Sequence, residues 1–135
     1  MNETLREIKR FHGHIGPYAI IGYKMGELAN KMLGSDPFSK KVVVWTGTTP
    51  PLSCIIDGLQ MSSGCTLGKG NILVHQKGSP KAQFTSNDGK KIEITLKPSI
   101  KDEIDTTVTE ENIVSFSEKF YQRTNQELFD ISQPV

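Results

Sequence analysis

The sequence predicts an α+β fold, with helices packed on an antiparallel sheet. Three observations predict it. Apolar residues recur at helical spacing near both ends of the chain, β-branched and alternating segments lie between them, and two of these segments flank a strong hairpin turn. The chain has 135 residues and no linker, repeat or low-complexity tract. We therefore expect one core domain over residues 1–135.

Two helices are predicted before the first strand. Residues 4–11 place an apolar side chain at every third position. Residues 17–33 begin with Pro17, which suits a first helical turn, and a glycine and a proline follow their end. Gly22 and Gly26 lie four residues apart on this helix, which indicates either close packing against another element or approach to a ligand or partner chain. The helix has one continuous apolar stripe, formed by Ile21, Met25, Leu28 and Met32.

The middle of the chain is expected to form the sheet. Four strands are predicted, at residues 41–47, 72–75, 82–86 and 91–96. The last two flank Asn87-Asp88-Gly89, in which the Asp-Gly pair suits positive φ angles. A helix over residues 52–63 is predicted between the first two strands. A final helix is expected to begin at Glu110 with Thr109 as its N-cap, and the apolar residues near position 130 are expected to pack on the core.

Charge and composition exclude several classes of protein. The 16 basic and 15 acidic residues give a net charge of +1, which disfavours a nucleic-acid-binding or polybasic membrane-binding surface. No apolar run approaches the roughly 18–20 residues of a spanning helix. The first ten residues are mostly polar and do not resemble a secretory signal. We therefore expect a cytoplasmic protein that binds neither nucleic acid nor membrane.

Histidine and cysteine provide the main indication of chemistry. The chain has three histidines and two cysteines, and four of these five lie in two glycine-rich segments. His12 and His14 flank Gly13, so in a turn both imidazoles could face one cavity. Alternatively, one histidine holds the other, or caps a helix, through a hydrogen bond. Imidazole and thiolate together suit zinc or a neighbouring first-row metal, so a metal site is expected if His12, His14, Cys54 and Cys65 meet.

The two cysteines flank the helix predicted at residues 52–63. Cys54 lies near its N-terminus, where the helix dipole favours the thiolate form, and Cys65 lies just past its end. A straight helix would separate them by roughly 15–18 Å. Both could then bind one metal only if the helix is shorter or the chain folds back. Otherwise one is a ligand and the other is not, or they serve different subunits of a dimer, and Cys65 could also be an ordinary core residue.

Two further residues are candidates for catalysis. Asp57 follows Cys54 by one helical turn and could orient a ligand histidine or act as a general base, although a solvated carboxylate is the alternative. Lys69 lies in a loop over residues 64–71 that contains three glycines. Such a loop could bind an anion through backbone N–H groups, or simply turn the chain into the next strand.

These segments resemble the FmdE family, which takes its name from one of the subunits of the molybdenum or tungsten formylmethanofuran dehydrogenase. The first family motif, F-H-G-H-x-C-P-G followed by G-Y-x-x-G, is similar here to residues 11–18 and 22–26. The second, C-x-x-D-x-x-Q-x-x-x-G-C-T-x-G-K-G-N, is similar to residues 54–71. With the strands that follow, the resemblance covers nearly the whole chain.

The resemblance implies an intertwined homodimer with a metal site. By position in the motifs, His14, Cys54 and Cys65 are implied as ligands of zinc or of another divalent metal such as nickel or iron, with His12 as a further candidate. Asp57, Gln60 and Lys69 are implied as residues that line the site. Two departures matter: Gly16 replaces the cysteine of the first motif, and no cysteine follows Cys65, so the C-terminal zinc-finger module of some members is not expected.

The leading hypothesis is therefore a metal-binding protein whose site is catalytic or binds a substrate. If it is an enzyme, it is metal-dependent or part of an oxidoreductase complex. The first alternative is a non-catalytic accessory subunit of a molybdenum or tungsten oxidoreductase, related to methanogenesis, in which larger subunits hold the pterin. No pterin or nucleotide is expected to bind to this chain alone. The second alternative is a thiol redox protein that uses Cys54 and Cys65.

Overall fold

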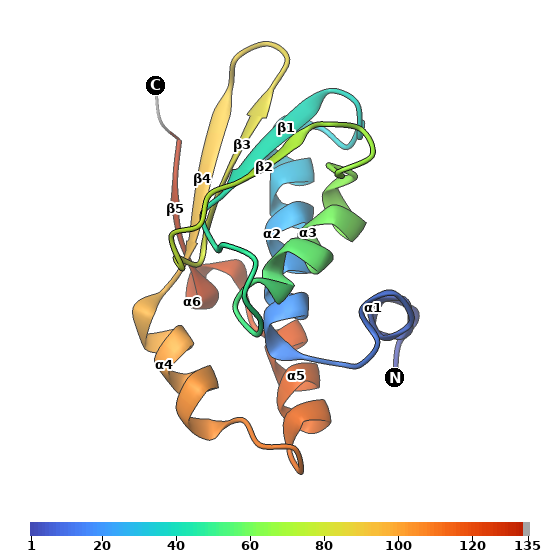
Figure 1. Cartoon of the computed structure of the whole chain (residues 1–135), viewed down its shortest axis with the longest axis vertical. Coiled ribbons are helices and arrows are strands. Elements are labelled where there is room, and N and C mark those ends of the chain that lie inside the picture. The colour runs from blue at the N-terminus through green and yellow to red at the C-terminus, as the bar shows by residue number, and fades with distance from the viewer. Residues whose placement is uncertain (134–135) are drawn as a thin grey trace.

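The sheet and its helical layer organise the whole chain (Figure 1). A computed structural model describes residues 1–133 and confirms the predicted α+β fold. The sheet has the strand order β2-β1-β3-β4-β5. Neighbouring strands are antiparallel except for β1 and β2, which are parallel. The strands are β1 (Lys40–Val44), β2 (Ile72–Val74), β3 (Lys81–Ser86), β4 (Lys91–Leu96) and β5 (Phe129–Ser132).

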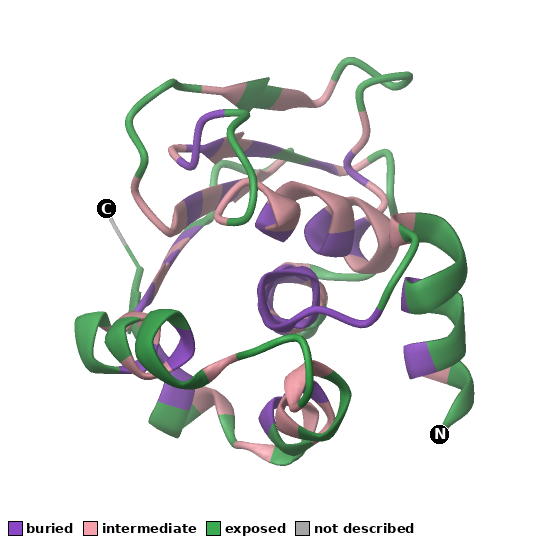
Figure 2. Cartoon of the chain, turned by 60° about the horizontal axis from the view of Figure 1, so that its bottom comes forward, coloured by how far each residue is buried: buried purple, intermediate pink, exposed green. Residues whose placement is uncertain are grey.

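The helices gather on one side of this sheet around α2, which is the one that packs most directly on it (Figure 2). Figure 2 shows α2 end-on, buried between the sheet and the other helices. It contacts α1, α3 and α5 as well as strands β3 and β4. The helices are α1 (Glu3–His12), α2 (Pro17–Leu33), α3 (Cys54–Ser63), α4 (Pro98–Thr107), α5 (Ile113–Gln122) and α6 (Asn125–Leu128). Among residues 1–133, none is both long and apolar enough to cross a bilayer.

The sheet register places apolar residues on the covered face. Val42 pairs with Phe84, which pairs with Ile92, and all three are buried. Successive side chains of a strand point to opposite faces. The intervening positions are accordingly more polar, as in the hydrogen bond of 3.2 Å from Gln83 Nε2 to Glu93 Oε2. The core therefore lies between this face and the helices.

Helices α2 and α3 pack closely because glycines remove side chains from their contact. A Cβ atom at Gly22 would lie 1.9 Å from the carbonyl oxygen of Ile55, and one at Gly58 would lie 1.9 Å from that of Ala19. Gly26 is equally close to Ser62. The close-packing interpretation of Gly22 and Gly26 is thus confirmed, and it fixes the position of α3 against α2.

Several predicted elements differ from the structure. The pair β1 and β2 is parallel because the connection between them is a crossover that contains α3, and such connections join parallel strands. The first strand is Lys40–Val44 rather than 41–47, and α3 begins at Cys54 rather than at residue 52. The last long helix begins at Ile113 with Asn112 as N-cap, not at Glu110, because residues 109–112 form a separate turn in which the Thr109 hydroxyl accepts from the Asn112 N–H.

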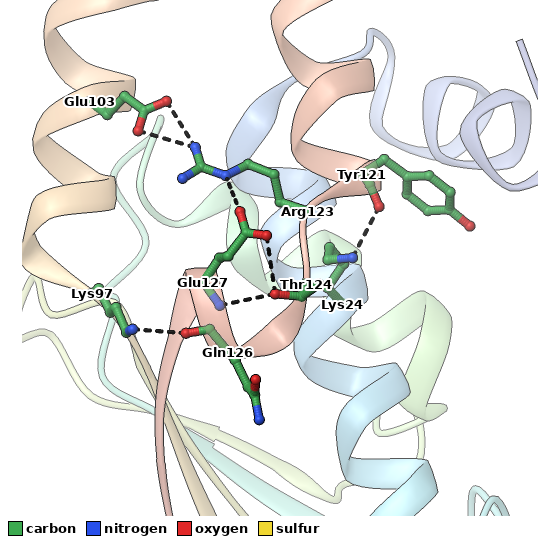
Figure 3. Close-up of polar contacts among 8 residues, drawn as sticks. All are labelled: Lys24, Lys97, Glu103, Tyr121, Arg123, Thr124, Gln126 and Glu127. Atoms are coloured by element: carbon green, nitrogen blue, oxygen red, sulfur yellow. Dashed lines mark hydrogen bonds and ion pairs between the residues drawn. The ribbon is translucent and has the colours of Figure 1, made fainter.

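Polar contacts hold the C-terminal helices together, and Figure 3 shows them in close-up. Arg123 Nη1 lies 2.9 Å from a carboxylate oxygen of Glu103 on α4, and its Nε lies 3.2 Å from Glu127 on α6. Lys97 Nζ donates to the carbonyl of Gln126 at 2.8 Å. These contacts join α4 to the segment between α5 and β5, and so fix the helix that forms one side of the cavity described below.

Candidate functional site

The two histidines of the first motif lie at the C-terminal end of α1. His12 is the last residue of this helix, and Gly13 follows in the left-handed region at φ 102°. A glycine adopts this conformation without steric cost, so the chain can turn sharply here. The imidazole rings of His12 and His14 are consequently neighbours, with centroids 4.8 Å apart. Both rings line one cavity.

A carboxylate holds the buried histidine. Nδ1 of His12 lies 2.6 Å from Oδ2 of Asp57 on α3, and the His12 side chain is only 9% exposed. A carboxylate accepts a hydrogen bond, so Nδ1 donates, and in the neutral imidazole the lone pair is then on Nε2. This Nε2 is buried and has no hydrogen-bond partner among the described residues. The pair therefore presents an unused ligating nitrogen.

Cys54 brings a thiol to the same cavity. It is the first residue of α3, one helical turn before Asp57. The helix N-terminus was expected to favour the thiolate, but this prediction is wrong. Burial in the first place, and the negative charge of Asp57 in the second, raise the pKa of the Cys54 thiol above its ordinary value. Without a bound cation the thiol is therefore protonated at neutral pH.

The cavity has a volume of about 340 Å³ and combines polar and apolar walls. This volume falls within the usual range for small-ligand pockets. Tyr18 and Asp105 also line it, and their side chains form a hydrogen bond of 2.5 Å. The apolar lining consists mainly of Pro50, Pro51, Ile104, Val108 and Ile113. The site thus combines segments that lie far apart in the sequence.

Cys65 lies in a different part of the molecule. It is fully buried beyond the C-terminal end of α3, where its Sγ is 3.7 Å from the carbonyl oxygen of Lys40. Helix α3 separates it from Cys54 by on the order of 15 Å. A disulfide requires Cα atoms within about 7 Å, so the two thiols cannot be joined within this chain. That geometry argues against the thiol redox alternative. A role for Cys65 in a dimer stays a prediction.

The glycine-rich loop is also separate from the cavity. Lys69 is exposed, with its ammonium 5.4 Å from the centre of the Phe38 ring. The N–H groups of Thr66, Leu67 and Lys69 already donate to side chains of the protein. This leaves them unavailable for an anion, so the loop geometry favours the turn interpretation. Gln60 helps to hold this loop, because its side-chain Oε1 accepts the hydrogen bond from the Leu67 N–H at 3.2 Å.

The structure therefore brings together His12, His14, Cys54 and Asp57, and leaves Cys65 and Lys69 elsewhere. Within residues 1–133, no three His, Cys, Asp or Glu side chains converge closely enough to hold a metal ion. Sequence reasoning missed Tyr18 and Asp105. Asp105 lies on α4, which was not predicted. Its apolar residues four positions apart and its N-terminal proline could have indicated that helix.

Comparisons with known proteins agree with this fold. The family described as FmdE, molybdenum formylmethanofuran dehydrogenase operon, matches residues 11–131. Over 75 residues, which are 54% of this chain, the sequence is 31% identical to a probable S-adenosyl-L-methionine-binding protein of Archaeoglobus fulgidus. That match covers 20% of the relative, so the chain spans only about a fifth of its length.

A solved structure shows the same architecture. It is the crystal structure, at 1.90 Å resolution, of a tungsten formylmethanofuran dehydrogenase FmdE-like protein from Syntrophus aciditrophicus. The TM-score is 0.66 with 20% sequence identity, and the match covers 98% of this chain and 70% of the other. At this identity the likeness shows the fold alone.

Proposed function

Because this chain belongs to the FmdE family, whose model matches residues 11–131, we propose that its cavity binds a first-row divalent metal, zinc foremost, through His12, His14 and Cys54. One observation carries the proposal. The His12 Nε2 atom is buried without a partner among residues 1–133, while Asp57 holds the opposite ring nitrogen. A carboxylate bound to the remote nitrogen is the usual support of a ligating histidine, since it fixes the tautomer and ring orientation.

The proposal assigns each residue a distinct role. His12 and Cys54 are ligands carried on helices α1 and α3. His14 is exposed, and its side chain must turn for the three groups to surround one ion. Asp57 positions His12, because its Oδ2 atom is hydrogen-bonded to Nδ1 of the imidazole. This role replaces the general-base role considered for Asp57, and Lys69 has no catalytic role in it.

A metal bound here would act as a Lewis acid or lower the pKa of a bound water. The residues of the chain set the conditions for binding. The Cys54 proton must be displaced, and its pKa is raised, so metal affinity is expected to increase with pH. The apolar cavity beside the histidines has room for a small organic substrate.

Metal content tests the proposal. Untagged protein is to be purified, titrated with zinc and measured by inductively coupled plasma mass spectrometry after removal of free ions. We expect about one zinc per chain, lost in Cys54→Ser and His14→Ala. In Asp57→Asn, the affinity is expected to fall by about 10- to 100-fold. Cys65→Ala is the matched cysteine control and should retain the metal. Failure of the parent protein to bind zinc, nickel or iron would refute the proposal.

A second candidate function is that of an accessory subunit, and an exposed apolar groove favours it. Phe11 and Leu67 are 58% and 82% exposed, and they line this groove with Met61 of α3. Such a surface is typical of an interface, either with a second copy of the chain or with larger molybdenum or tungsten oxidoreductase subunits. Sedimentation of the purified protein and copurification from its native host test these partners. Replacing Leu67 with Asp should abolish whichever association is found, while leaving zinc content unchanged.

A further inference from the structure

A second functional region of the cavity lies at Tyr18 and Asp105. Tyr18 stands in the first turn of α2 and is only 4% exposed. Its hydroxyl donates to Oδ1 of Asp105 at 2.5 Å, and Lys101 Nζ lies 2.6 Å from Oδ2 of the same carboxylate. Both Tyr18 and Asp105 line the cavity, whereas Lys101 does not. This wall therefore presents a phenol and a carboxylate to the cavity, and the cation that pairs with the carboxylate lies outside.

The two side chains of this wall can accept further hydrogen bonds but cannot donate any. A phenol has one proton, and Tyr18 gives it to Asp105. Burial in the first place, then Asp105, raises the pKa of Tyr18 above its ordinary value, so the proton stays on the phenol. Burial raises the pKa of Asp105, but hydrogen bonds from Lys101 and Tyr18 outweigh it and leave the net pKa below its ordinary value. Both residues can therefore only accept further hydrogen bonds.

The charged residues that line the cavity also favour a ligand that is a cation or a hydrogen-bond donor. Among residues 1–133, no lysine or arginine lines it, and Asp105 is the one carboxylate that does. Inside the cavity an anionic ligand would face this carboxylate with no lysine or arginine beside it, because Lys101 pairs with Asp105 from outside. A cation or hydrogen-bond donor would find acceptors, while the apolar side chains of Ile104, Val108 and Ile113 could cover its hydrocarbon part.

The wall is also held in place. Arg123 pairs with Glu103, which lies two residues before Asp105 on α4 (Figure 3). Tyr18 lies on the central helix α2. A recognition group on ordered helices needs little rearrangement to bind. The Asp105 side chain is 40% exposed, but its contacts with Tyr18 and Lys101 hold the carboxylate at the edge of the cavity.

We propose that this cavity recognises a small, partly apolar molecule through a positively charged or hydrogen-bond-donating group, such as an amine, placed against Asp105. The proposal concerns the Tyr18 and Asp105 wall alone. It is argued and tested for the cavity without a metal, so the two proposals can fail separately.

Three probes of one size test the ligand class: benzylamine, benzyl alcohol and benzoate. Each is to be titrated into metal-free, isotope-labelled protein at neutral pH and fixed ionic strength, with binding followed by amide NMR shifts. We expect benzylamine to bind more tightly than benzyl alcohol, benzoate not to bind, and the shifts to map to Ile104, Ile113 and the start of α2. A repeat with zinc-loaded protein shows whether the metal alters this order.

Matched variants identify the recognising group. Asp105→Asn should weaken benzylamine binding by about tenfold or more, because it removes the charge that accepts from the ammonium. Asp102→Asn removes the same charge from a position on the same helix that does not line the cavity, and should have little effect. Tyr18→Phe should retain binding, since Asp105 remains. Tighter binding of benzoate, no benzylamine binding, or an unaffected Asp105→Asn variant would overturn the proposal.

Discussion

Gly58 determines how closely α3 can approach α2, and replacing it with alanine should be costly. A Cβ atom there would lie 1.9 Å from the carbonyl oxygen of Ala19 and 2.5 Å from the backbone nitrogen of Tyr23. Both are backbone atoms and cannot rotate away as a side chain could. Ordinary contact begins at 3.4 Å, so the helices must separate locally by up to 1.5 Å, the difference between 3.4 and 1.9 Å.

The magnitude follows from two opposing terms. Overpacking costs about 1–3 kcal/mol, and a backbone contact on this scale belongs at the upper end. The substitution also stabilises the helix by about 1 kcal/mol, because alanine is a better helix former than glycine. The free energy of unfolding should therefore fall by about 2 kcal/mol. Because Asp57 precedes Gly58 on α3, the separation would also disturb its contact with His12.

Urea denaturation followed by circular dichroism measures this difference. Gly68→Ala is the matched control, because Gly68 is exposed and a Cβ atom there would meet nothing within 4 Å. We expect the control to unfold at the midpoint of the parent protein. Equal stability of Gly58→Ala and Gly68→Ala would show that α2 and α3 do not approach each other so closely at Gly58.

Three more predictions concern the cavity and the thiols. In Gly16→Ala the new Cβ atom would lie 2.9 Å from Cε1 of His14, so the imidazole must shift. The NMR resonances of this imidazole should move, while the free energy of unfolding changes by less than about 1 kcal/mol. Unmoved resonances would contradict the contact. In folded protein, iodoacetamide should modify Cys54 but not the fully buried Cys65. The rate of modification at Cys54 should still be rising above pH 9, because the pKa of its thiol is raised. Mass spectrometry after timed quenching measures this rate, and a plateau near neutral pH would contradict the raised pKa. Asp105 has a net lowered pKa in the folded state, so the stability it contributes is present above about pH 4 and lost as the pH falls through the folded value. The difference in urea stability between the parent and Asp105→Asn should shrink in acid, and a difference that does not vary with pH would contradict the interaction.

Local signals explain which elements could be predicted from the sequence. Pro17 and Gly34 mark the ends of α2, and both bounds agree with the structure. Asn87-Asp88-Gly89 marks the β3–β4 turn, where Gly89 has a φ of 90°. Helix α4 has no capping side chain and a largely polar sequence, so propensity alone gives it little signal. Proline or glycine at an element's end was therefore sufficient where a strong apolar or β-branched pattern accompanied it, and Pro98 alone did not reveal α4.

The site was predictable in its chemistry but not in its geometry. The residue types and spacing of His12 and His14 indicated that both could face one cavity, and both do line one. The contact between His12 and Asp57 spans 45 residues. No local pattern encodes a pairing of this kind, because it depends on the docking of α1 against α3. The position of Cys65 away from Cys54 follows from the straight course of α3, which the sequence left open.

The walls of the cavity come from residues 12–19, 50–54 and 104–113, so no short continuous fragment of the chain contains the site. Any ligand that needs these walls binds the folded chain and not the unfolded one. At a free concentration 100 times its dissociation constant, such a ligand adds about 2.7 kcal/mol to the free energy of unfolding. Occupancy of the cavity would thus be coupled to the folding of the whole chain: a ligand bound there at such a concentration would lower the population of unfolded chains that proteases can attack.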